Sequence, residues 1–269
     1  MATTAWADGH RALYHWQRFN EDRLGAALAS NRIYCSSPGA FNDPWDCKPH
    51  FNSDVLADPV ENQRHVDWAV DVCNRKAPML PQAVESLQQT LLADRARASE
   101  LINQISAAMA PAINERYRVY CLGPDVGNLL MWAHYAEDHK GICVEFDLRN
   151  DTLCGALKCD YLPAFPVMKL HDNSEAASLS ILLSKSDVWQ YEQEYRLIAQ
   201  ERAVAIPGAY MLMTDDSLLR LPAMALRAIV AGCQADYDRV RGLVAQVAPQ
   251  VTVRRAVRVP NRYELAIEG

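Results

Sequence analysis

The 269-residue sequence has no long uncharged apolar stretch and no excess of basic residues. No segment reaches the roughly 18 uncharged apolar residues of a membrane span, and the first residues lack the basic and apolar regions of a secretory signal. We therefore expect a cytoplasmic protein with no membrane partner. The net charge of −6 also argues against a broad nucleic-acid-binding surface.

Metal-ligating patterns are also scarce. The eight cysteines include no C-x-x-C pair, and the closest pair, Cys154 and Cys159, has no histidine nearby in the sequence. His134 and His139 are five residues apart, so they diverge on a regular helix and do not form a metal-binding pair. We expect reduced thiols, no disulfide and no bound metal.

Repeats, low-complexity segments and Gly/Ser-rich linkers are missing as well. Half of the residues are apolar, which is enough for a hydrophobic core. We therefore expect residues 1–269 to form a single domain.

The chain begins with a predicted strand, helix and strand. Alternating residues in "ALYHWQRF" are typical of a half-buried strand, Asn20 can cap a helix over "EDRLGAALAS", and "RIYCSS" follows as the second strand. Residues from about 53 to 116 carry apolar side chains at helical spacing, which predicts a helical insert.

The second half predicts the remaining strands, and we expect them to belong to one sheet. They are "RYRVYCLG", "GICVEFDL", "LKCDYL", "EQEYRLIAQ" and a closing strand, helix and strand from "ALRAIVAGCQ" onward. The predicted fold is α+β, with a mixed or antiparallel central sheet and a helical insertion between the second and third strands.

A first polar segment follows the second strand, at residues 36–46, "SSPGAFNDPWD". Gly39 permits a positive φ, and Asn42 or Asp43 can fold its side chain onto the backbone in an Asx turn. The alternative is a purely structural turn that its two aromatic side chains anchor to the core.

A second polar segment, "NLLMWAHYAEDHKGICVEFD", predicts a helix that Asn128 caps and that ends at Gly141 in the left-handed region. Trp132 and Tyr135 lie on one face of this helix, which is polar and aromatic for a core face. His134 is either a hydrogen-bonded structural residue or a catalyst.

The third segment is "KSDVWQYEQEYRLIAQ". If it forms a strand, Glu192, Glu194 and Arg196 share one face. Two interpretations stay open: a structural ion pair of glutamate with Arg196, or a carboxylate of raised pKa that is available for proton or cation chemistry.

These motifs, in this order, resemble the bacterial family catalogued as domain of unknown function 2971. The resemblance extends over nearly the whole chain and rests on the Leu-Tyr-x-aromatic opening and on the three polar segments quoted above. It implies that the Asn-Asp-Pro triplet belongs to a site with distant polar partners, namely His134, Tyr135, Lys140, Gly141, Trp189, Glu192, Glu194 and Arg196.

The order of elements is also similar to that of ADP-ribosyltransferases. This similarity implies that NAD is bound as a substrate, that His15 on the first strand holds it, and that Ser36 on the second strand supports the ribose. Glu194, with Glu192 before it, would stabilise an oxocarbenium-like transition state. The predicted catalytic residues are Glu194, Glu192 and His134, and the predicted cofactor-binding residues are Tyr14, His15, Ser36, Asn42, Asp43, Tyr135, Trp189 and Arg196.

Two other functions compete with an NAD-using enzyme that modifies a macromolecular or small-molecule target. In a metal-dependent phosphodiester-acting enzyme, the oxygens of Asn42, Asp43, Asp46 and Glu194 would collect a divalent cation. In a non-enzymatic module, a groove with Trp132, Tyr135 and Trp189 would bind a nucleotide or a protein. In each case we expect Asp43 and His134 to line the same pocket.

Overall fold

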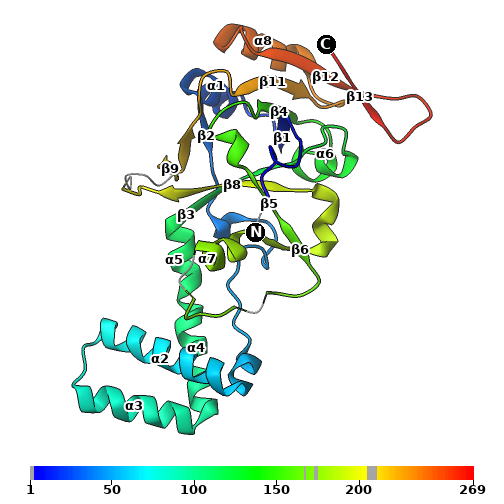
Figure 1. The fold of residues 1–269 in the computed structure, drawn as a ribbon. Coiled ribbons are helices and arrows are strands. Elements are labelled where there is room, and N and C mark those ends of the chain that lie inside the picture. Colours follow the sequence, from blue (N-terminus) through cyan, green and yellow to red (C-terminus); the bar gives the residue numbers. More distant parts are fainter. Residues whose placement is uncertain (1–2, 167, 173–174, 205–210) are drawn as a thin grey trace.

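The protein is α+β, with strands in mixed sheets. The structure is a computed structural model that describes residues 3–166, 168–172, 175–204 and 211–269 (Figure 1). Within these ranges, none of the helices combines the length and the apolar character needed to cross a membrane.

One sheet has five strands in the order β1-β4-β11-β12-β13, and only β11 and β12 run parallel. Helices α1 (Glu21–Ser30) and α8 (Tyr237–Val247) pack against each other next to this sheet (Figure 1). As predicted, the Asn20 side chain caps α1 by accepting from Arg23 N at 2.9 Å. The strands are β1 (Ala12–Gln17), β4 (Ile142–Asp147), β11 (Leu226–Ala231), β12 (Thr252–Arg258) and β13 (Leu265–Glu268).

A second sheet takes the order β2-β10-β9-β8-β3, with β5 also paired to β8, and a separate pair joins β6 to β7. The strands are β2 (Arg32–Tyr34), β3 (Tyr117–Leu122), β5 (Leu157–Lys158), β6 (Asp160–Leu162), β7 (Ser184–Ser186), β8 (Tyr195–Glu201), β9 (Leu212–Asp215) and β10 (Leu218–Arg220). The predicted strands therefore do not all belong to one sheet. β1 pairs with β4 in the first sheet, whereas β2 and β8 belong to the second. In the second sheet, β9 and β10, which the sequence did not predict, lie between β2 and β8.

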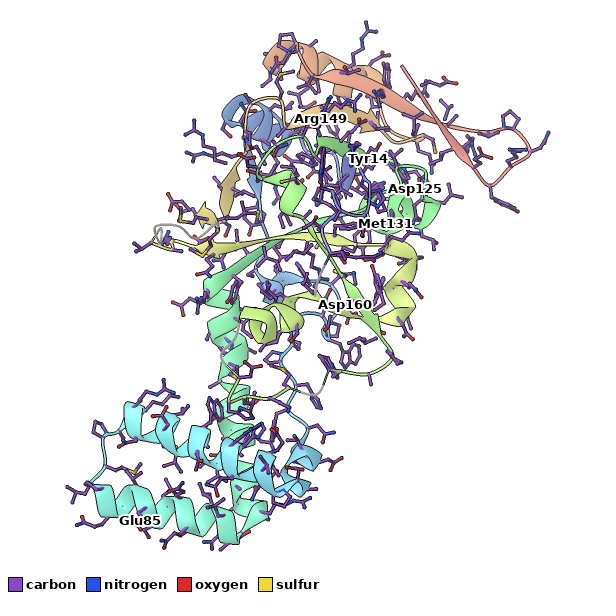
Figure 2. All side chains as sticks on the ribbon, viewed as in Figure 1. Tyr14, Glu85, Asp125, Met131, Arg149 and Asp160 are labelled. Atoms are coloured by element: carbon purple, nitrogen blue, oxygen red, sulfur yellow. The ribbon has the colours of Figure 1, made fainter. Side chains whose placement is uncertain are left out.

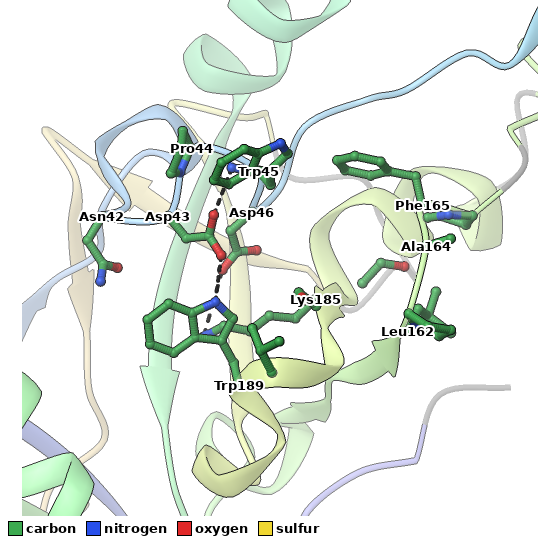
Figure 3. Close-up of a pocket in the computed structure, with 15 residues that line it drawn as sticks. Asn42, Asp43, Pro44, Trp45, Asp46, Leu162, Ala164, Phe165, Lys185 and Trp189 are labelled. Atoms are coloured by element: carbon green, nitrogen blue, oxygen red, sulfur yellow. Dashed lines mark hydrogen bonds and ion pairs between the residues drawn. The ribbon is translucent and has the colours of Figure 1, made fainter.

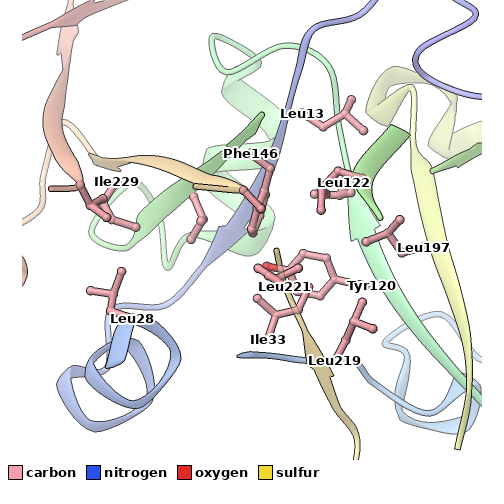
Figure 4. Close-up of a cluster of buried hydrophobic side chains, with 14 of the residues drawn as sticks. Leu13, Leu28, Ile33, Tyr120, Leu122, Phe146, Leu197, Leu219, Leu221 and Ile229 are labelled. Carbon is pink, nitrogen blue, oxygen red and sulfur yellow. The ribbon is translucent and has the colours of Figure 1, made fainter. Parts of the chain in front are cut away.

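The main core lies where the two sheets and α1 meet (Figure 4). Leu13 and Phe146 come from the first sheet, Leu122 and Leu197 from the second, and Leu28 from α1; all five are buried. Burial of each such side chain stabilises the fold by about 1.5–3 kcal/mol.

Four helices follow one another between β2 and β3: α2 (Pro59–Lys76), α3 (Pro81–Ala93), α4 (Arg95–Ala107) and α5 (Met109–Arg116). A small cluster of their own, with Val66, Val70, Leu91 and Ala98 buried, holds α2, α3 and α4 together. The α2-α3 hairpin lies away from both sheets, with Glu85 of α3 at its outer end, and α4 and α5 lead back to β3 (Figures 1 and 2).

Helix α6 (Leu129–Tyr135) is shorter than predicted and ends six residues before Gly141. The chain leaves it through three consecutive residues with positive φ, which are Glu137, Asp138 and His139, so Gly141 is not the left-handed residue. Gly141 is required for another reason, because a Cβ there would lie 2.3 Å from the Gln17 carbonyl oxygen.

The cysteines agree with the prediction of reduced thiols. All eight are free, and Cys35, Cys47, Cys143 and Cys159 are buried. Burial raises the pKa of Cys35 to about 12, which keeps that thiol protonated at neutral pH.

Candidate functional site: two adjoining cavities

Lys185 of β7 is the centre of a buried group of charges. Its Nζ donates to Glu192 Oε2 and, at 2.7 Å, to Glu194 Oε2. Glu192 ends the short helix η4 (Asp187–Glu192) and is not on the strand, because Gln193 takes a positive φ of 48° and turns the chain into β8. The two carboxylates therefore meet at Lys185 from different elements. Lys185 was not among the predicted site residues, although its place directly after the apolar run "SILLS" is a signal for a buried lysine.

Arg196 of β8 continues the charge group on the side away from the solvent. Its side chain is 0% exposed. The guanidinium donates to both oxygens of Asp46 at 2.9 and 2.6 Å, to Glu194 Oε1 at 2.8 Å and to the Leu182 carbonyl at 2.6 Å. Of the two interpretations of Glu194, the ion pair with Arg196 is therefore present.

The charge group consists of five side chains: Asp46, Lys185, Glu192, Glu194 and Arg196. Its two glutamates have pKa values shifted in opposite directions. Burial favours the neutral form of Glu194, but the charges of Arg196 and Lys185 hold the pKa of Glu194 below its usual range. Burial raises the pKa of Glu192, and attraction to Lys185 offsets this only in part. Glu194 thus stays anionic, whereas Glu192, whose pKa is raised, is the more easily protonated of the two carboxyls.

Four of these five buried charged groups line a cavity of about 340 Å³, which we call the polar cavity. Arg196, a predicted cofactor-binding residue, is fully buried and does not line it. The polar lining of the cavity comes from β1, the loop after β2, α6, β7, η4 and the residue before β8. These side chains, which are far apart in the sequence, are His15, Asn42, Asp46, His134, Tyr135, Lys185, Glu192 and Glu194.

His15 has a defined tautomer in this cavity. Its Nδ1 lies 2.8 Å from the Cys121 carbonyl oxygen, which can only accept a hydrogen bond. Nδ1 therefore carries the proton, and Nε2 carries the free lone pair. The ring stacks on Tyr120 at 4.2 Å between centroids. Burial lowers the pKa of His15, so the ring is neutral and its Nε2 can accept a hydrogen bond from a bound molecule.

Helix α6 brings Tyr135 and His134 to the lining of the polar cavity. As predicted, Asn128 caps this helix by accepting from Leu130 N and Met131 N. The Tyr135 hydroxyl donates to Glu192 Oε1 at 2.6 Å. The orientation of α6 therefore decides where the Glu192 carboxyl lies.

Besides Arg196, three further residues of the predicted sites lie away from the polar cavity. Tyr14 does not line the polar cavity and packs beside Trp16, with 6.3 Å between ring centroids. Ser36 forms a backbone bridge to Val119 and lines a separate cavity of about 690 Å³, which also reaches His15. Trp132 is fully buried and donates to the Val126 carbonyl, so it is a core residue and not part of a groove.

A second cavity of about 570 Å³ adjoins the first, and we call it the aromatic cavity (Figure 3). The predicted Asx turn is present here: Asp43 Oδ1 accepts from Trp45 N at 2.9 Å, and Asp43 Oδ2 accepts from the Trp189 indole at 2.7 Å. Trp45 does not anchor the loop to the core, because it is 65% exposed. Gly39 has no positive φ either; it is needed because a Cβ there would lie 2.6 Å from Asn114 Nδ2.

The predicted meeting of Asp43 and His134 in one pocket is not observed. Asp43 lines the aromatic cavity and His134 the polar cavity. Trp189 links the two, because it donates to Asp43 and its ring centroid lies 6.4 Å from that of His134. The two cavities share Asn42, Asp46 and Lys185 as a common border.

A further group of metal-ligating residue types lies away from both cavities. Ligand atoms of Glu61, His65 and His171 lie within 4.8 Å of one another. Glu61 already accepts from Lys169 Nζ at 2.8 Å, and His171 Nε2 lies 3.0 Å from Glu61 Oε2. These contacts tie α2 to the segment that precedes α7 (Glu175–Leu183). From the sequence, only the spacing of four residues between Glu61 and His65 on one predicted helix could indicate such a group.

Comparisons of this chain with family models, with curated proteins and with solved structures found no match.

Proposed function

We propose that this protein is an ADP-ribosyltransferase-like enzyme that uses NAD, and that it belongs to the family its motifs resemble. The observation that carries the proposal is the pair Glu192 and Glu194, held by Lys185 in the wall of the polar cavity with His15 as another lining residue. This arrangement brings together the first-strand histidine and the late glutamate expected of such an enzyme.

In the proposed reaction, the bond between the nicotinamide nitrogen and ribose C1′ breaks. The bonding electrons leave with nicotinamide, which becomes neutral, and C1′ becomes an oxocarbenium centre. Asp46, Glu192, Glu194 and Lys185 line the cavity wall. Together with Arg196, which is paired to Asp46 and Glu194 but does not line the cavity, they carry one net negative charge when all are ionised. Such a wall stabilises positive charge that develops on the sugar.

A nucleophile then forms the new bond to C1′ and loses a proton. The nucleophile is water in hydrolysis and a hydroxyl or amine of the target in transfer. Glu192 is the acceptor of this proton, because its pKa is raised while that of Glu194 is held low. His15 is neutral, so its Nε2 positions the substrate by accepting a hydrogen bond.

The donor set favours this chemistry over the metal-dependent phosphodiester alternative. Both oxygens of Asp46 accept from Arg196, and both oxygens of Asp43 accept from Trp45 and Trp189. A divalent cation would have to displace these donors and would then lie next to two existing cations, Lys185 and Arg196.

The test is release of nicotinamide from NAD by the purified protein, with a cell lysate supplied as acceptor. Loss of a general base costs about 100- to 10,000-fold in rate, so we expect Glu192→Gln to lose at least 100-fold. Glu145→Gln is the matched control, because Glu145 is about equally buried and ion-paired, with Arg254, but lies on β4 and lines neither cavity. Wild-type protein that releases no nicotinamide would overturn the proposal.

A further inference from the structure

We propose that the aromatic cavity is a nucleobase-binding subsite. The inference deepens the proposed function, on which it rests for the identity of the reaction, by naming the chemical class that occupies the space beside the glutamates. The ligand is a flat nitrogen heterocycle carried by a nucleoside or nucleotide.

The first argument is the position of Trp45. This side chain is 65% exposed, and no aromatic ring of the described residues stacks on it. Its backbone is nevertheless held by Asp43, whose other oxygen holds Trp189. One carboxylate therefore positions two indoles at the same cavity, and an exposed indole on an ordered loop offers a face for stacking.

The second argument is the opposite wall. Figure 3 shows Leu162, Ala164 and Phe165 across the cavity from Trp45, with Lys185 between the two sides. The cavity is thus bounded by aromatic and aliphatic side chains on two sides. Its volume of about 570 Å³ lies within the range of small-molecule sites.

The third argument is a polar group at the border. Asn42 lines both cavities and is exposed, and within the described ranges its side-chain amide makes no hydrogen bond to the protein, so it is free to bind a ligand. An amide offers one donor and one acceptor side by side, which is the pattern that asparagine uses to bind the edge of adenine. A purely apolar ligand would leave this amide unused, so the combination favours a nucleobase.

The fourth argument is continuity. Asp46 and Lys185 also border both cavities, so a molecule in the aromatic cavity lies next to the carboxylates that carry the proposed chemistry. A nucleobase there has two sources: the adenine half of NAD itself, or a second nucleotide that accepts the ADP-ribosyl group.

The test uses AMP, GMP, CMP and UMP as probes, titrated into the full-length protein by calorimetry and by tryptophan fluorescence. We expect saturable binding of AMP with quenching of tryptophan emission. Base stacking on an aromatic side chain is worth about 5- to 150-fold in affinity, so Trp45→Ala should weaken binding by that factor. Its melting temperature should stay close to that of the wild type, because the side chain is mostly exposed.

Trp6→Ala is the matched control. Trp6 is also exposed, at 40%, and lines neither the polar nor the aromatic cavity. This variant should bind AMP as the wild type does. Absence of binding of all four nucleotides at millimolar concentration, or equal affinities of the wild type and Trp45→Ala, would overturn the inference.

Competition distinguishes the sources of the base. If the adenine half of NAD occupies the cavity, AMP competes with NAD and Trp45→Ala raises KM for NAD. If a separate acceptor occupies it, AMP leaves KM for NAD unchanged, and Trp45→Ala slows transfer but not NAD hydrolysis. AMP binding without any turnover of NAD would refute the proposed function and leave the subsite standing. Turnover of NAD without nucleotide binding at Trp45 would refute the subsite and leave the proposed function standing.

Discussion

At the scale of single residues, the buried charges around Arg196 are the most consequential feature of the molecule. Arg196 and Lys185 both donate hydrogen bonds to Glu194, and Arg196 also donates to both oxygens of Asp46. A buried charge is tolerated only when it is paired, so the loss of one member changes the balance for all the others.

The first prediction compares the two ends of one ion pair. Arg196→Met leaves Asp46, Glu192 and Glu194 with only Lys185, and breaking a buried pair in this way costs about 3–5 kcal/mol of unfolding free energy. Glu194→Gln leaves two carboxylates with two cations, so it should cost only the charge-assisted hydrogen bonds, about 1.5–3 kcal/mol. Urea denaturation of both variants measures the difference.

Arg254→Met is the control for this comparison. Arg254 pairs with Glu145 at 2.8 Å, but its side chain is partly exposed and Arg227 also lies near Glu145. We expect a smaller loss than for Arg196→Met. A Glu194→Gln variant that is less stable than Arg196→Met would contradict this account of the charge balance.

At the scale of elements, α6 links the two halves of the site. Asn128 accepts from the first amides of α6 and also donates its Nδ2 to the Tyr191 carbonyl at 2.7 Å. Tyr191 precedes Glu192 in η4, so one side chain fixes both the helix that carries Tyr135 and the turn that carries Glu192. The sequence predicted the cap, because capping is local. It could not predict the bond to η4, which joins residues 63 positions apart.

The second prediction separates these two roles of Asn128. Asn128→Asp keeps an oxygen for the cap but loses the donor to Tyr191, so α6 should stay folded while η4 loosens. Hydrogen–deuterium exchange should speed up in residues 187–194 and remain unchanged within α6. Asn20→Ala, which removes the cap of α1 alone, should leave exchange in 187–194 at the wild-type rate. Unchanged exchange of 187–194 in Asn128→Asp would count against the link.

At the scale of the whole molecule, the sequence predicted most elements but not how the strands divide into sheets. Period-two and helical patterns are local, so β1, α1 and the helices between β2 and β3 could be recognised. The two sheets depend on β9 and β10, which are only four and three residues long and have no clear pattern. For the same reason the sequence named Glu194 and His15 but missed Lys185, whose importance comes from its position between two carboxylates.

The helices between β2 and β3 are joined to the rest of the molecule partly through Glu61. On α2, Glu61 accepts from Lys169 and lies beside His171, both in the segment before α7. The hydrogen bond from His171, followed by that from Lys169, lowers the pKa of Glu61 from its ordinary value of 4.5 to about 2. A carboxylate whose pKa is depressed by folding stabilises the fold at pH values above its unfolded pKa.

The last prediction follows from the sign of this shift. The contribution of Glu61 should be fully present above about pH 4.5 and should disappear as the pH falls toward about 2. Glu61→Gln should therefore be less stable than the wild type at pH 7, and the two proteins should converge as the pH falls through this range. Urea denaturation at stepped pH measures the convergence. Asp67→Asn on the same helix is the control. Among the described residues the Asp67 side chain accepts hydrogen bonds from Gln63 and Gln88 alone, so this variant keeps the link from Glu61 to Lys169 and His171 and should still lose stability in acid. A constant gap between Glu61→Gln and the wild type from pH 7 to pH 2 would show that the ion pair does not join the helices to the rest of the fold.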